Sequence, residues 1–175
     1  MWIKNKLLGV ICKGKIGSVF NILSFNSYMR YTVWYYKKMG IKLDKPITYI
    51  HPSAYFDSHN YSLISIGKNV TISRNVTFLV HDYSIANALT HCGYTVDEGV
   101  PHFEKGIEVG ENSFIGANAI LLPGTKLGKN CIVGSATVVK GDFEDNSIIV
   151  GNPARVIADT EEWAKKKWEL KDWSV

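Results

Sequence analysis

An aliphatic or aromatic side chain returns every six residues along two stretches of this chain. The recurring positions are Ile66, Ile72 and Phe78, and then Val109, Ile115, Leu121, Leu127, Val133 and Val139. A second set, four residues after seven of these positions, is small or β-branched: Val70, Val76, Ser113, Ala119, Thr125, Cys131 and Thr137. A period of six fits neither a helix face, which recurs at about 3.6 residues, nor a strand, which recurs at about two. The pattern predicts a solenoid in which both sets point inwards.

Glycines mark where each repeat turns. Gly67, Gly110, Gly116, Gly128 and Gly134 directly follow five of the recurring aliphatic residues. A backbone that turns every six residues needs tight corners, which a Cβ atom obstructs. Each hexad is therefore predicted to be one short strand and one corner. Three hexads would make a triangular coil, and stacked coils would pair equivalent strands.

The repeats resemble a known family. The runs IGKNVTISRNVTFLVHD, VGENSFIGANAILLPGTKLGKNCIVGSATVVKGDF and NSIIVGNPARVI, within residues 64–157, are similar to those of the hexapeptide-repeat acyltransferases. Among these, the O-acetyltransferases of sugars and surface polysaccharides, of the galactoside and maltose acetyltransferase type, are the most similar. The resemblance implies an all-β solenoid wound as a left-handed parallel β-helix. The hand comes from the resemblance alone, since the usual crossover rule gives a right-handed connection.

We expect three parts in the chain. Residues 1–45 form a basic helical arm, residues 46–157 the β-helix with a protruding loop at 82–106, and residues 158–175 a C-terminal helix. The first part carries a net charge of +8 and the remainder −4. Residues 27–39 predict an aromatic helix that ends at Gly40. We expect this helix to cover the open strand edges of the first coil.

A peripheral membrane contact is the alternative role for the basic arm, because anionic lipid attracts such charge. No nucleic-acid-binding motif accompanies the charge. The apolar stretches at 7–12 and 19–25 are too short and too interrupted for a signal peptide or a membrane span. Cys12, Cys92 and Cys131 form an odd number without paired spacing, which favours a reducing cytoplasm. Cys131, at an inward position, is expected in the core.

The C-terminal residues 160–170 predict an amphipathic helix with Asp159 or Thr160 as its N-cap. Trp163 and Leu170 share one face, and Trp168 follows five residues after Trp163. We expect this helix to pack against the prism, although a surface for a partner stays open as an alternative.

The repeat is interrupted once, by 31 residues between Phe78 and Val109. Since 31 is not a multiple of six, the intervening chain cannot continue the coil and must project from it. Long loops without repeats are more often functional than not. His81 stands at the root of this segment, where the resembling enzymes place their catalytic histidine. Imidazole is a suitable general base for a sugar hydroxyl, so the resemblance makes His81 the candidate base.

Asp82 either orients the imidazole of His81 or caps the turn, and the sequence leaves both interpretations open. His91 and His102 lie farther into the loop and are expected to be exposed, with contact to the acceptor as the alternative. Together with Cys92 they match no zinc-ligand spacing, so we expect no metal.

The donor side follows from the resemblance, which implies acetyl-CoA as co-substrate. Ala117 matches the family position beside the thioester arm, and Ser135 a second contact along the pantetheine. Lys140 and Gly141 fall where the family often has Thr followed by Lys, so the lysine comes one residue early. Arg155 is the other cation expected near the nucleotide. Ser135, between inward Val133 and Thr137, is expected to point outwards, and Gly151 and Pro153 to turn the chain out of the last coil.

The sequence therefore predicts an acetyl-CoA-dependent O-acetyltransferase acting on a sugar or polysaccharide precursor, with active sites at the boundaries of a homotrimer. The trimer is implied by the resemblance only. An N-acetyltransferase of an amino sugar and a non-catalytic β-helix scaffold are the alternatives.

Overall fold

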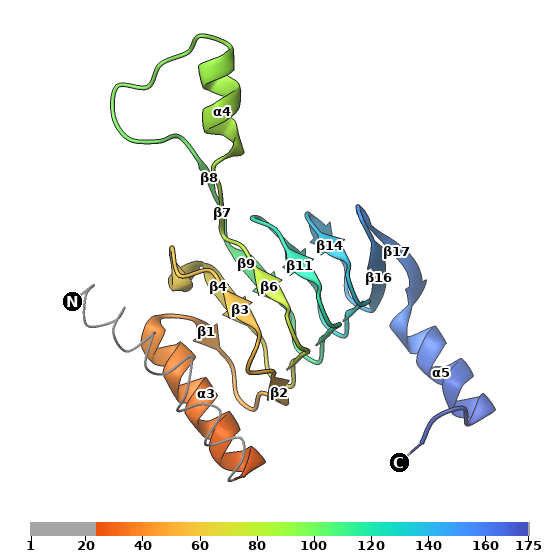
Figure 1. Cartoon of the computed structure of the whole chain (residues 1–175). Helices are drawn as coiled ribbons and strands as arrows, with labels where there is room; N and C mark the ends of the chain where they lie inside the picture. The colour runs from red at the N-terminus through yellow and green to blue at the C-terminus, as the bar shows by residue number, and fades with distance from the viewer. Residues whose placement is uncertain (1–23, 175) are drawn as a thin grey trace.

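The structure is a computed structural model that describes residues 24–174. Short parallel strands form three sheets, which make the sides of a prism (Figure 1). Sheet A contains β1 (Lys42–Leu43), β4 (Ile64–Ile66), β9 (Ile107–Val109), β12 (Lys126–Leu127) and β15 (Asp142–Phe143). Sheet B contains β2 (Tyr49–Ile50), β5 (Thr71–Ile72), β10 (Phe114–Ile115), β13 (Ile132–Val133), β16 (Ser147–Gly151) and the antiparallel β17 (Ala154–Asp159). Sheet C contains β3 (Tyr55–Phe56), β6 (Thr77–Phe78), β11 (Ile120–Leu121) and β14 (Val138–Val139).

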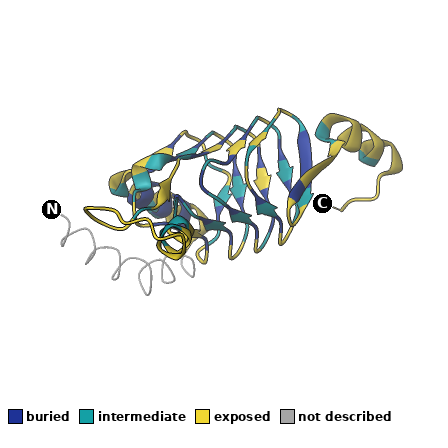
Figure 2. Ribbon diagram, turned by 90° about the horizontal axis from the view of Figure 1, so that it is seen from above, coloured by how far each residue is buried: buried dark blue, intermediate teal, exposed yellow. Residues whose placement is uncertain are grey.

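Both inward columns predicted from the hexads are confirmed. The recurring aliphatic and aromatic residues are at most 3% exposed, and the buried small or β-branched set fills the same interior. Ile115 lies in register between Ile72 and Val133, so each residue stacks on its equivalent in the next coil. Burying such a side chain contributes about 1.5–3 kcal/mol. The interior of the prism is therefore one continuous apolar core (Figure 2).

The corner glycines are required by stacking. A Cβ atom added to Gly110 would lie 2.2 Å from the carbonyl oxygen of Gly128, in the next coil. At Gly116 the added atom would lie 2.7 Å from Ser135 N. Neither glycine has a positive φ. Only glycine lets the coils approach this closely.

The left-handed backbone conformation of the corners is supplied by asparagines. Asn112 and Asn130 have φ angles of 58° and 57°, and asparagine tolerates this region better than most residues. Asn112 Nδ2 donates to Asn130 Oδ1 at 3.2 Å. The same side-chain contact extends the row below and above, giving a ladder of Asn69, Asn112, Asn130 and Asn146. A shorter ladder joins Asn75 to Asn118 on the next corner.

The first end of the prism is covered by α3 (Phe25–Met39), whose C-cap is Gly40, as predicted. Tyr28 Oη donates to the carbonyl of Ile50 at 2.6 Å, and the ring of Tyr36 contacts that of Phe56. The solenoid also has a coil that the hexad pattern did not reveal, formed by β1, β2 and β3. Its first strand lies before residue 46, where we expected the β-helix to begin. Residues 1–23, and with them the predictions made for this segment and for Cys12, lie outside the described residues.

The segment between Phe78 and Val109 projects from the prism, as predicted (Figure 1). It is not the irregular loop that its composition indicated. β7 (His81–Asp82) and β8 (Phe103–Glu104) form an antiparallel pair at its root, and α4 (Ser84–His91) forms one side. We call residues 81–104 the projecting loop.

At the other end, β16 turns at Asn152 and Pro153 into β17, which leads into α5 (Thr160–Leu170). Asp159 caps α5 and accepts hydrogen bonds from the backbone N–H groups of Glu161 and Glu162. The expectation that α5 packs against the prism is wrong, because none of its side chains is buried (Figure 2). Trp163 and Trp168 are 45% and 67% exposed. Within residues 24–174, no helix has the length and apolar character needed to cross a membrane.

Candidate active site

The root of the projecting loop holds a histidine–carboxylate pair. His81 follows sheet C at the corner that leads to sheet A, and Asp57 follows sheet C at the same corner one coil earlier. The winding brings the two side chains together although 24 residues separate them, and His81 Nδ1 bonds to Asp57 Oδ2. An ionised carboxylate only accepts hydrogen bonds, so Nδ1 carries the proton and Nε2 keeps a lone pair. His81 is thereby held in the tautomer that a general base requires.

Asp57 is well placed to hold this pair rigid. The residue is only 2% exposed. Its Oδ1 accepts from the backbone N–H of His59 at 3.0 Å, and its Oδ2 accepts from that of Val80 at 3.1 Å. A buried carboxylate with several fixed donors loses little freedom when it also binds an imidazole. Sequence reasoning missed Asp57, since no repeat or motif marks it.

Asp82 caps the turn, which is one of the two roles that the sequence left open for it. Its Oδ1 accepts from the backbone N–H of Ser84 at 2.8 Å. The hydrogen bonds from Ser84, backbone first and then side chain, and after them the positive charge of Lys140, hold the pKa of Asp82 below its usual value. The carboxylate that accepts a hydrogen bond from the His81 imidazole is that of Asp57.

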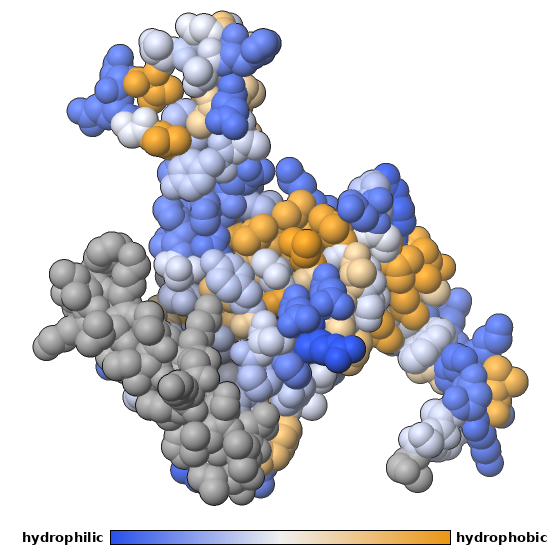
Figure 3. Space-filling view, viewed as in Figure 1, coloured by the Kyte–Doolittle hydropathy of each residue, from blue (hydrophilic) through white to orange (hydrophobic). Residues whose placement is uncertain are grey.

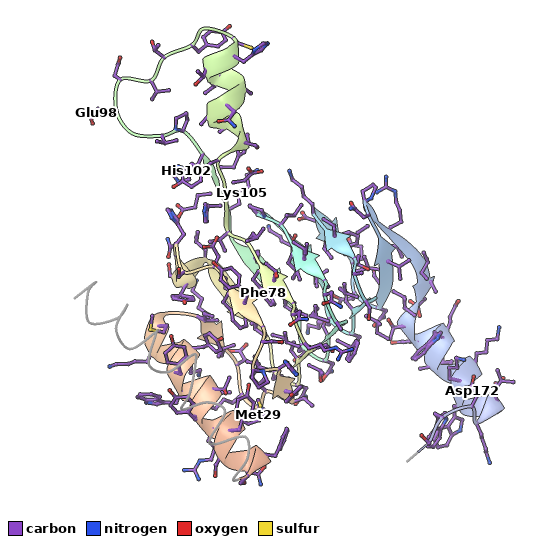
Figure 4. The ribbon with its side chains drawn as sticks, viewed as in Figure 1. Met29, Phe78, Glu98, His102, Lys105 and Asp172 are labelled. Atoms are coloured by element: carbon purple, nitrogen blue, oxygen red, sulfur yellow. The ribbon has the colours of Figure 1, made fainter. Side chains whose placement is uncertain are left out.

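Four aromatic rings close a circle around the root of the loop, a group we call the ring quartet: His59, His81, Tyr83 and His102. His59 lies 4.6 Å from His81 and 5.4 Å from His102, between ring centroids. Tyr83 lies 5.2 Å from His81 and 4.7 Å from His102. Figure 4 shows His102 close to Lys105 at this root, below Glu98, which lies on the side of the loop.

The quartet is fastened at two further points. His59 Nε2 lies 3.4 Å from Glu104 Oε1, which joins the first coil to β8. His102 Nδ1 bonds to the carbonyl oxygen of Val100 at 3.0 Å. Within residues 24–174, no three His, Cys, Asp or Glu side chains are grouped in a way that could hold a metal ion.

The residues expected to bind the donor lie at two different corners. Ala117 and Ser135 occupy the corner between sheets B and C in successive coils, and Ala136 N donates to the carbonyl of Ala117 at 2.8 Å. Ser135 is exposed, so the outward orientation is confirmed. Within the described residues the Ala117 N–H donates no hydrogen bond.

Lys140 and Gly141 occupy the corner between sheets C and A, on the same edge as His81. Lys140 is exposed, and a Cβ added to Gly141 would meet no atom within 4 Å. Arg155 lies on β17 and donates to the carbonyl of Ala154 at 2.8 Å. In one chain, therefore, the histidine and the Ala117–Ser135 corner stand at opposite edges of sheet C.

The outer faces of the three sheets differ in polarity. On sheet A, the outward positions Lys42, Ser65, Glu108, Lys126 and Asp142 are polar or charged. On sheet C they are Tyr55, Thr77, Ile120 and Val138. On sheet B they are Tyr49, Thr71, Phe114, Ile132 and Ile148, of which Ile148 is buried. Phe114 and Tyr55 are 43% and 41% exposed. Figure 3 shows apolar surface over β11 and β14 and again over β17. Two sides of the prism are thus unusually apolar for a free surface.

Several solved structures share this fold. A galactoside acetyltransferase in complex with coenzyme A superposes with a TM-score of 0.59 at 22% identity, covering 95% of this chain and 90% of that one. A hexapeptide-repeat-containing acetyltransferase from Vibrio cholerae superposes with a TM-score of 0.58 at 17% identity, covering 90% of this chain and 93% of that one. At these identities the likeness concerns the fold.

Comparison with known protein sequences shows which family the chain is related to. The chain is 34% identical over 141 residues to protein CapG of Staphylococcus aureus, covering 79% of this chain and 77% of CapG. It is 28% identical over 152 residues to the putative acetyltransferase YvoF of Bacillus subtilis, covering 85% of this chain and 78% of that protein. It is 30% identical over 112 residues to the galactoside O-acetyltransferase of Escherichia coli, which covers 64% of this chain and 51% of that enzyme, so the chain spans about half of the latter. The model for bacterial transferase hexapeptides (six repeats) matches residues 106–141. The chain therefore belongs to the bacterial hexapeptide-repeat transferases, and among them to the acetyltransferases.

Proposed function

We propose that the protein moves an acetyl group from acetyl-CoA to a hydroxyl of a sugar or of a surface-polysaccharide precursor. The observation that carries the proposal is the Asp57–His81 pair at the root of the projecting loop. It leaves one imidazole nitrogen as a base in a half-buried position. Relatives and structural neighbours that act as galactoside and maltose O-acetyltransferases support the reaction type.

The reaction needs one proton carrier. His81 Nε2 takes the proton from the acceptor hydroxyl as its oxygen attacks the thioester carbon. When the tetrahedral intermediate collapses, the carbon–sulfur bond breaks, and the imidazolium returns the proton to the departing thiolate. The products are an O-acetyl ester and free coenzyme A. Asp57 stabilises the transient imidazolium and keeps its Nδ1–H in place.

The tetrahedral intermediate carries an oxyanion that needs a fixed donor. The Ala117 N–H, which donates to no other described residue, is our candidate. The exposed Ser135 and the open space at Gly141 suit a pantetheine arm lying along the corners. Lys140 and Arg155, both exposed, would serve the phosphates of coenzyme A as cations. Asp82 acts on His81 through its charge alone in this scheme.

The site as a whole requires a second chain. We infer a left-handed β-helix assembled as a homotrimer, in which the His81 edge of one prism faces the Ala117–Ser135 corner of its neighbour. Support comes from the apolar outer faces of sheets B and C beside the charged face of sheet A. A symmetric oligomer would bury the apolar faces and leave sheet A to solvent.

Mixing two impaired variants, assayed at acetyl-CoA concentrations too low to saturate Ser135→Tyr, tests the shared site. In His81→Ala the base is missing, and in Ser135→Tyr the donor corner is obstructed. A trimer refolded from equal amounts of both contains boundaries in which an intact His81 faces an intact corner. Random assembly makes this about one boundary in four, so about a quarter of wild-type activity should return. A site built within one chain would give no recovery, because every chain carries one defect.

The substrate class is tested by measuring thiol release from acetyl-CoA with a panel of hexopyranosides, amino sugars and buffer alone. We expect turnover with hydroxyl acceptors, and a loss of about 10²–10⁴-fold in His81→Ala with the affinity for acetyl-CoA retained. Preference for amino sugars would favour an N-acetyltransferase. No turnover with any acceptor, in a folded protein, would favour a scaffold.

A further inference from the structure

We propose that His102 is a specificity-determining residue of the acceptor site, where its Nε2 accepts a hydrogen bond from a second hydroxyl of the acceptor. This inference rests on the proposed function and extends it. The acceptor it describes is a ring compound with two neighbouring free hydroxyls, one acetylated and one bound by His102. The ring quartet carries the argument.

The tautomers of two quartet histidines are fixed by their partners. His81 Nδ1 faces the Asp57 carboxylate, and His102 Nδ1 faces the Val100 carbonyl. Neither partner can donate a hydrogen bond, so both Nδ1 atoms carry the proton. An imidazole with its one proton on Nδ1 presents Nε2 as an acceptor. Two lone pairs on one small cluster suit a ligand that offers two O–H donors.

The spacing of the rings fits one small ligand. The ring of Tyr83 contacts both histidines, at centroid distances of 5.2 and 4.7 Å. The rings of His81 and His102 therefore lie within about 10 Å of each other. With hydrogen bonds of about 2.8 Å on each side, two neighbouring hydroxyls of one sugar can reach both nitrogens. Tyr83, which is 41% exposed, supplies an aromatic face and an O–H beside them.

The neighbouring histidine has a different role. His59 lies against both His81 and His102, and its Nε2 is engaged with Glu104. This contact ties the first coil to β8, and so fixes the root of the projecting loop against the prism. His102 is thereby held at a set position relative to the base. His91, on α4, lies outside the quartet and is exposed.

The test compares His102→Phe with His102→Gln, and uses His91→Phe as the matched control on the same loop. Phenylalanine keeps a flat ring against Tyr83 and His59 but removes the acceptor nitrogen, whereas glutamine restores a hydrogen-bond acceptor. Michaelis constants are measured for methyl hexopyranosides and for their singly deoxygenated derivatives. We expect His102→Phe to raise the acceptor KM about 3- to 10-fold without changing the KM for acetyl-CoA, and His102→Gln to recover part of it. His91→Phe should behave as wild type.

The deoxy sugars identify the hydroxyl. For one deoxy sugar, the KM of the wild type should rise by the same factor by which His102→Phe raises the KM for the parent sugar. The KM of His102→Phe should not rise further with this deoxy sugar. If His102→Phe keeps the wild-type KM, or if every deoxy sugar loses affinity equally in both proteins, the role of His102 is overturned while the acetyltransferase stands. A folded wild type that acetylates no sugar overturns both.

Discussion

Imidazole alone is a modest base, and at the scale of single residues its neighbours decide what it does. Asp57 brings three features to His81: burial, two backbone donors on its own oxygens, and a direct bond to Nδ1. Such a partner selects one tautomer and stabilises the protonated ring during the reaction. Asp82, one residue from His81 in the chain, has its side chain committed to Ser84.

We therefore predict unequal effects for the two carboxylates. Asp57→Asn should lower kcat about 10²–10⁴-fold, because the amide can present an N–H to the imidazole and so permit the wrong tautomer. Asp82→Asn keeps an oxygen for the Ser84 N–H and should lower kcat less than about tenfold. Steady-state kinetics at saturating acetyl-CoA measure both. Equal losses in the two variants would contradict the assignment of Asp57.

At the scale of elements, the corners determine the regularity of the prism. The Asn75–Asn118 ladder stops at Ala136, which has a φ of 59° without an amide to continue the row. Alanine is strained in this region, and Asn118 has no asparagine above it.

Ala136→Asn should thus stabilise the fold by about 0.5–1.5 kcal/mol, by relieving strain and extending the ladder. For a chain of this size we expect a rise in Tm of about 1–6 °C. Ala136→Gly is the control, since glycine relieves the strain without adding an amide. If the two variants melt together, the ladder contributes nothing.

The hexad register allows a second prediction for this scale. Ile115→Asp should prevent folding, because the charge would enter a dry column without a partner. Phe114→Asp places the same group one residue earlier, on the outer face of sheet B. This variant should fold and keep the far-UV circular dichroism spectrum of a β protein. A soluble Ile115→Asp protein with a native melt would show that the register is wrong.

In the molecule as a whole, α3 and α5 lie at the two ends of the prism, and the candidate site residues lie on the edges between them. Obstructing one edge should affect binding more than stability. Ser135→Tyr should leave Tm nearly unchanged, since the residue is exposed, and should raise the dissociation constant for acetyl-CoA by at least about tenfold. An inward side chain would instead cost about 1–3 kcal/mol through overpacking. Donor titration and thermal melting of this variant separate the outcomes, and unchanged donor affinity would remove Ser135 from the site.

The six-residue period of the sequence predicts much of this architecture, and the parts that it did not predict have physical causes. The coils from Ile64 to Val139 were predictable because a six-residue repeat fits no other regular structure. The first coil was not, since Leu43 and Ile50 are seven residues apart and no glycine marks the turns. Asp57 was missed because only the winding brings it beside His81. The packing of α5 was predicted wrongly, since an amphipathic pattern shows that a helix has an apolar face but not which surface covers it.

The stacking of coils also acts as a ruler. Leu121 and Val139, eighteen residues apart, are paired partners in adjacent coils, and each coil advances by one strand spacing, about 4.8 Å. Residues on one edge are therefore spaced by whole coils. Asp57, His81, Gly124 and Lys140 lie in successive coils on one edge, and Ala117 and Ser135 lie in two successive coils on another. Removing one eighteen-residue coil would bring Lys140 about 5 Å nearer to the projecting loop without disturbing strand register. The number of coils between two residues on one edge thus sets the distance between the points at which they can contact an extended ligand.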